Sequence, residues 1–147
     1  MNQFSLMARF NGWANDRLYE SISGLADEAY REDRAAFFGS IHNTLNHLLV
    51  VDRLWTGRIE GIDHGISSLD QILFDDFASL SEARTPENRR LIAVVDALSD
   101  AQLETPVAYR RMIGDGEGKT RRDHMLLTLL NHQTHHHRRQ SHQCIEH

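Results

Sequence analysis

The chain has 147 residues, of which 40% are hydrophobic and 25% are charged. This is the size and composition of one soluble globular domain, so we expect a single domain over residues 1–147 and exclude a disordered chain. The formal net charge of −5 argues against nucleic acid as a partner, because phosphate-binding surfaces usually carry a basic excess. Arg121, Arg122, Arg138 and Arg139 are the residues from which a local basic patch could form.

The cysteine content and the apolar segments bear on where the protein works. Cys144 is the single cysteine, so the chain cannot form an internal disulfide. No apolar run is long enough to cross a membrane, and the first residues lack the pattern of a signal peptide. We therefore expect a cytoplasmic protein without a membrane partner.

Apolar residues recur at helical spacing in four stretches, which predict helices over residues 3–23, 40–60, 76–98 and from about 120 onward. Ser40 is a suitable N-cap for the second helix, and a polar connection over residues 27–34 precedes it. Pro86 falls inside the third helix and indicates either a fresh helix start or a kink. Both alternatives remain open.

The connections between these stretches indicate the fold class. Residues 107–119 contain a glycine-rich turn and are expected to form a short extended segment. The other connections are mostly short, which is typical of an all-α four-helix bundle. The longest gap, which begins at residues 61–65, is expected to be a crossover connection between helices 2 and 3.

Histidine is over-represented: there are 10, and six of them fall between His132 and His147. His132 and His136 are one helical turn apart and continue the apolar stripe of Met125 and Leu129, so both rings should point into the bundle. Two inward imidazoles one turn apart can share a metal ion. The alternative is an ordinary pair of surface or core histidines.

A third ligand should come from a facing helix, and His47 lies at the edge of the apolar arc of the second helix. His42 falls on the polar side of that helix, His64 lies in a loop, and His124 lies outside the apolar stripe. We therefore predict a metal site of His47, His132 and His136.

The remaining histidines are not expected to be ligands. His135 and His137 should point away from the apolar stripe, whereas His142 and His147 are close to the end of the chain.

Three neutral imidazoles suit a divalent ion, with zinc or nickel as first choices and iron as a third. Three protein ligands leave coordination positions for water or substrate, which is typical of catalytic sites. A water or thiol bound there would have a lowered pKa and become a nucleophile.

Several other side chains allow two interpretations of their role. Asp52 is expected either to orient a ligand histidine or to pair with an arginine such as Arg9 or Arg17. Trp13 and Trp55 are expected in the core rather than as substrate-stacking residues. The catalytic residues stay unassigned, and Asp52 and Tyr109 are conjectures for a general base.

Three segments resemble motifs of the DNA-damage-inducible (DinB) family. Residues 44–49, followed by Asp52 and Trp55, are similar to its second-helix motif. Residues 131–136 resemble its C-terminal motif, and residues 7–15 resemble its first helix. The resemblance extends over nearly the whole chain in the same order.

The resemblance implies a four-helix bundle with one long crossover and a metal held at His47, His132 and His136. It also implies a homodimer. Characterised relatives in the wider superfamily are metal-dependent enzymes that transfer small thiols to electrophiles or isomerise maleylpyruvate.

One segment departs from the family pattern. After the second ligand, members typically continue with His-Arg-Gly-Gln and further apolar turns, whereas this chain continues from His137 with polar residues and lacks that glycine. We expect this departure to affect the last helical turn and any dimer or substrate contact there.

The leading hypothesis is a metal-dependent transferase that uses a low-molecular-weight thiol, or a related hydrolase or isomerase. The alternative is a non-catalytic metal-binding protein in a stress response or an interaction. A third hypothesis is a structural helical dimer whose histidines bind metal only adventitiously.

Overall fold

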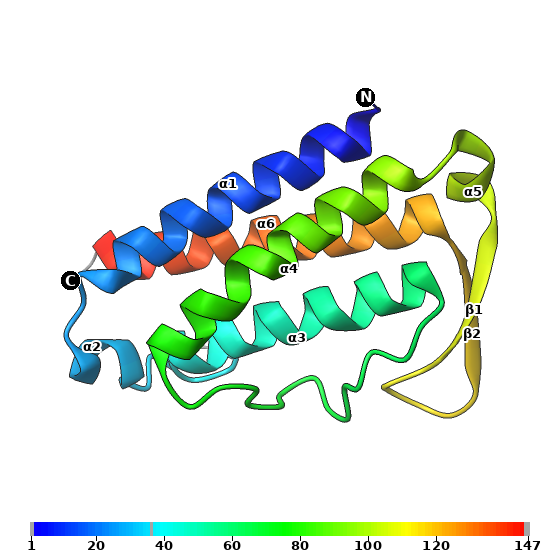
Figure 1. Cartoon of the computed structure of the whole chain (residues 1–147). Helices are drawn as coiled ribbons and strands as arrows, with labels where there is room; N and C mark the ends of the chain where they lie inside the picture. Colours follow the sequence, from blue (N-terminus) through cyan, green and yellow to red (C-terminus); the bar gives the residue numbers. More distant parts are fainter. Residues whose placement is uncertain (1, 36, 146–147) are drawn as a thin grey trace.

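The computed structural model describes the backbone of residues 2–35 and 37–145, and the side chains of these ranges up to residue 140. Its main elements are four long helices (Figure 1): α1 (Gln3–Ser23), α3 (Ile41–Glu60), α4 (Phe77–Ala97) and α6 (Arg122–Ile145). Both α1 and α3 pack against α4 and α6. The expected all-α four-helix bundle is therefore confirmed.

The crossover determines the directions of the helices. The segment between α3 and α4 runs back along the bundle, so that α3 and α4 point the same way, while α1 and α6 point the opposite way (Figure 1). The crossover predicted between the second and third long helices, which are α3 and α4, is thus confirmed. It brings the C-terminal half of α6 alongside the first half of α3.

Side-chain caps fix the starts of the long helices. Ser40 accepts a hydrogen bond from the Asn43 amide at 3.1 Å, and Asp76 accepts one from the Ser79 amide at 2.7 Å. Gly61 ends α3 in the left-handed conformation with a φ of 75°. Helix α4 continues through Pro86, which excludes a fresh helix start at that residue.

Three smaller features complete the described chain. The short helix α2 (Asp27–Arg31) lies where only a polar connection was expected, and α5 (Asp100–Glu104) was not predicted. The predicted extended segment is an antiparallel hairpin of β1 (Pro106–Arg110) and β2 (Glu117–Arg121), in which Val107 pairs with Thr120. The hairpin leads directly into α6.

The interior is filled by leucine, isoleucine and valine from the four long helices, together with Phe4, Tyr19, Tyr30 and Met125. Trp55 is half-buried and packs against this core, whereas the expectation for Trp13 was wrong because its side chain is 58% exposed. Trp13 lies against Phe10 on the outer face of α1. The homodimer stays a prediction.

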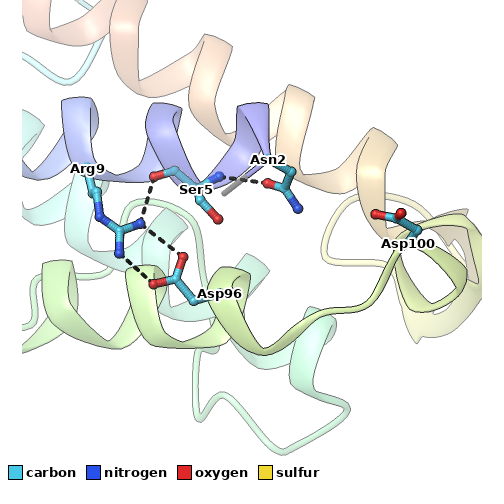
Figure 2. A pocket seen from close by; sticks show the side chains of 5 residues that line it. All are labelled: Asn2, Ser5, Arg9, Asp96 and Asp100. Carbon is cyan, nitrogen blue, oxygen red and sulfur yellow. Dashed lines mark hydrogen bonds and ion pairs between the residues drawn. The ribbon is translucent and has the colours of Figure 1, made fainter.

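An exposed ion pair connects α1 with α4. Arg9 donates two hydrogen bonds to Asp96, at 2.9 and 2.6 Å, and one to the Ser5 carbonyl at 3.2 Å (Figure 2). The hydrogen bond from Arg9 lowers the pKa of Asp96 to about 2. Arg9 is therefore not the partner of Asp52, and Arg17 instead lies near Glu20. The hollow around this ion pair contains no histidine.

The long helices bear on two further features of the chain. No helix among the described residues is long and apolar enough to cross a membrane. Arg122 begins α6 and Arg138 lies 16 residues further along it, about 24 Å away at the helical rise. The four arginines of the expected basic patch therefore do not form one surface.

Candidate metal centre

Helices α3 and α6 bring His47, His132 and His136 together. One ring nitrogen from each lies within 4.8 Å of the others, and His47 is buried while the other two are half-buried. His132 and His136 are one turn apart on α6, and His47 faces them from the first half of α3. The structure thus groups the three predicted residues in an arrangement that can hold a metal ion.

The backbone of the crossover determines the proton position on His47. Its Nδ1 lies 2.9 Å from the Leu69 carbonyl oxygen, which can only accept a hydrogen bond. Nδ1 therefore carries the proton, and the Nε2 lone pair of the neutral ring is free. This is the usual arrangement of metal-binding histidines, whose second nitrogen donates to an oxygen.

Gln133 determines the proton position on His132. Its side-chain nitrogen donates to the Leu48 carbonyl at 3.1 Å and to the Asp52 carboxylate at 2.5 Å, so its oxygen must face the other way. That oxygen lies 3.1 Å from Nδ1 of His132. His132 Nδ1 therefore donates, and its Nε2 is also left without a proton.

The two free nitrogens face each other. Nε2 of His47 lies 3.0 Å from Nε2 of His132. With the protons on Nδ1 of both rings, no hydrogen bond connects these atoms, and two lone pairs at this distance repel. A cation between them removes the repulsion, because tetrahedral ligands at about 2.0–2.1 Å from zinc lie roughly 3.3 Å apart.

Burial keeps the three rings neutral. It lowers the pKa of His47 and of His132, and it lowers the pKa of His136 to about 3, with a further contribution from the neighbouring His132 and His47. Neutral imidazole is the form that binds metals, because protonation removes the lone pair. The site is therefore in its ligand form near neutral pH.

A cavity of about 670 Å³ opens from the three histidines to the surface. Phe38 covers one face of His47, with ring centroids 3.9 Å apart and an interplanar angle of 23°. Leu69, Met112 and Ile113 add apolar wall from the crossover and from the turn between β1 and β2. The volume lies in the range of small-molecule sites.

Behind the histidines, a buried polar network connects the four long helices. Asp52 is ion-paired with Arg84, and both side chains are almost fully buried. Arg84 also donates to Asn88 at 2.9 Å, and Asn88 accepts from Asn15 at 2.8 Å. Asp52 thus holds Gln133, which orients His132, and its arginine partner is Arg84 rather than Arg9 or Arg17.

Two expectations about histidines were wrong. His137 is buried and bonds Asn15 at 2.6 Å, which adds a second α6 residue to the network. Burial lowers the pKa of His137 to about 4. His42 is 5% exposed and bonds the Tyr30 hydroxyl at 2.6 Å, because α2 covers a face of α3 that the sequence pattern marked as polar.

The remaining candidates lie outside the centre. Tyr109 bonds Thr120 at 3.1 Å and lines a separate pocket with His64, so the structure does not place it beside the histidines. His124 is exposed, as expected. His135 is exposed and lies at the cavity rim, 5.4 Å from His136 between ring centroids. His142 and His147 lie outside the residues whose side chains the structure describes.

Sequence reasoning missed Gln133, Arg84 and the Leu69 carbonyl. Gln133 follows a predicted ligand directly and lies on the buried side of α6, which could have drawn attention to it. Arg84 and Leu69 belong to segments far away in the chain, and no local pattern links them to the histidines.

Comparison with known proteins identifies the family of the chain. The sequence model of the DinB family matches residues 1–141, a range that includes the three histidines and the polar network behind them. A search of functionally curated proteins gives no match. The family match covers nearly the whole chain, and the chain therefore belongs to the DinB family.

Proposed function

We propose that this chain binds one divalent metal ion through His47, His132 and His136 and acts as a metal-dependent transferase of a small thiol. The observation that supports metal binding best is the pair of unprotonated Nε2 atoms at 3.0 Å. A related hydrolase or isomerase reaction would use the same site.

The chain's own residues have separate tasks in this proposal. The Leu69 carbonyl orients the His47 ring and Gln133 orients the His132 ring, so that the Nε2 lone pairs point toward the ion. Phe38 shields His47 from water. Zinc or nickel suits three imidazoles best, with iron as a third choice. When bound, the ion lowers the pKa of a thiol or water in its open position.

The lining of the cavity favours a thiol over water as the nucleophile. Asp70 is the one carboxylate among the described lining residues, and it is bonded to Ser68. No described side chain is therefore placed as a free carboxylate base beside the histidines. A thiol ionises more readily than water, so lowering its pKa on the metal needs no such base.

The lack of a free carboxylate also suits the second candidate, a metal-binding protein without catalysis. The two candidates differ in one measurable property. A transferase accelerates the reaction of a thiol with an electrophile when loaded with metal, whereas the non-catalytic protein leaves that rate unchanged.

The first test is the metal content of untagged protein, measured by elemental analysis. We expect about one metal ion per chain in the wild type and almost none in His47→Ala. His124→Ala is the matched control, because His124 is an exposed histidine outside the cluster. Equal metal content in the wild type and in His47→Ala would refute the three-histidine site.

A further inference from the structure

The cavity beside the histidines is flanked by the two most exposed large apolar side chains among the described residues. Phe37 is 89% exposed and Ile113 is 76% exposed, and both line this cavity. They come from unrelated segments, since Phe37 precedes α3 and Ile113 lies in the turn between β1 and β2. Large exposed apolar groups that gather at one cavity commonly mark a binding site.

The cavity lining combines polar and apolar groups. Its polar groups are the histidines and Arg139 from α3 and α6, with Ser67, Ser68 and Asp70 from the crossover. Phe37, Met112 and Ile113 provide apolar surface. Covering apolar surface contributes about 25 cal/mol for every Å² removed from water. A ligand that contacts only the metal position would leave this surface in water.

We propose that the cavity binds a small molecule with an aromatic or branched alkyl body, which packs between Phe37 and Ile113 while a donor group points toward the histidines. The donor end rests on the proposed metal site. The apolar end does not, because Phe37 and Ile113 line the cavity and neither belongs to the histidine cluster.

Hydrocinnamate and acetate form a suitable pair of probes. Both carry one carboxylate, which suits either a metal ion or Arg139, and they differ in the phenylethyl body. The difference between their affinities therefore reports the apolar contact alone. We would measure both dissociation constants by NMR titration, on zinc-loaded protein and on protein treated with a chelator.

We expect hydrocinnamate to bind roughly tenfold more tightly than acetate, or better, in both forms of the protein. Phe37→Ser and Ile113→Ser should each weaken hydrocinnamate roughly threefold to tenfold and leave acetate unchanged. Both residues are so exposed that their replacement should not unfold the chain. Leu6→Ser is the matched control, because Leu6 is 64% exposed on α1 and lies outside this cavity.

Three outcomes would overturn the inference. The first is equal affinity for the two probes, and the second is hydrocinnamate binding that neither serine variant weakens. The third is a dimer that Phe37→Ser dissociates and that hydrocinnamate does not enter, which would make a second copy the occupant of the cavity. A chain that binds no zinc but still prefers hydrocinnamate would refute the proposed function and support this inference.

Discussion

Gln133 shows how one amide can orient a candidate metal ligand. Its nitrogen is held by an acceptor on each of two α3 residues, Leu48 and Asp52, so its oxygen has one orientation. That orientation assigns the proton of His132 to Nδ1. We therefore expect the residue to affect metal binding without touching the metal position.

Replacing this amide should weaken metal binding. Gln133→Leu removes the group that orients His132, and we expect the metal dissociation constant to rise about 10- to 100-fold. Competition with a chromophoric zinc chelator measures this constant. Gln140→Leu is the control, because Gln140 is also buried on α6 and its side-chain oxygen has no hydrogen-bond partner among the described residues. Unchanged affinity in Gln133→Leu would show that His132 needs no such partner.

His42 should make folding stability sensitive to acid. Burial lowers the pKa of His42 below its usual 6.5, and Arg31 lowers it further, whereas the nearby Asp27, Asp75 and Asp76 raise it. Since the folded protein resists protonation of this ring, stability falls as the pH drops below about 6.5, by up to about 1.4 kcal/mol for each pKa unit of the shift.

The variant His42→Asn isolates this effect. Asparagine can still bond Tyr30 but does not titrate, so the stability difference between wild type and variant should shrink between pH 7.5 and pH 5. Urea denaturation of metal-free protein at both pH values measures the difference. A difference that is constant with pH would mean that His42 is not buried in its neutral form.

At the level of elements, the sequence predicted the bounds of most long helices. Helical spacing located α1, α3 and α4 to within one or two residues at each end, and Ser40 caps α3 as expected. Local patterns did not reveal α2 and α5, which are too short to show helical periodicity. They also could not decide the effect of Pro86, because packing against α1 and α3 determines whether α4 continues.

Pro86 should cost α4 stability. It is exposed, and its nitrogen cannot donate to the helix. Pro86→Ala restores this donor, and we expect the free energy of unfolding to rise by about 1–2 kcal/mol after the greater entropy of the unfolded chain is subtracted. Chemical denaturation measures the change. A less stable variant would indicate that the proline shapes the helix that positions Arg84.

For the whole molecule, a metal ion would connect helices far apart in the chain. His47 and His132 are separated by 85 residues, and the ion would join α3 to α6 across the bundle. The sequence predicted that the three histidines face one another, because helical spacing places His47 at the inner edge of α3 and the other two at the inner edge of α6. It did not predict the polar network behind them, because these pairs join different helices.

Metal should therefore stabilise the fold as a whole. Free zinc at about 100 times its dissociation constant adds about 2.7 kcal/mol, which corresponds to a rise of roughly 5–10 °C in the unfolding temperature. Thermal unfolding with zinc and with a chelator measures this rise. The rise should persist in His124→Ala and disappear in His47→Ala, and equal shifts in all three proteins would indicate binding elsewhere.

The buried network also has a consequence for recombination between related genes. Four of its members, Asn15, Asp52, Arg84 and Gln133, come one from each long helix, and each is buried. A recombinant gene that joins α6 of one relative to the other helices of another keeps the network only when both parents use the same partners. A mismatch at Gln133 would leave one oxygen of the buried Asp52 carboxylate without its hydrogen bond, at a cost of about 1–3 kcal/mol. Proteins encoded by mosaics of divergent genes should therefore be less stable than proteins encoded by either parental gene.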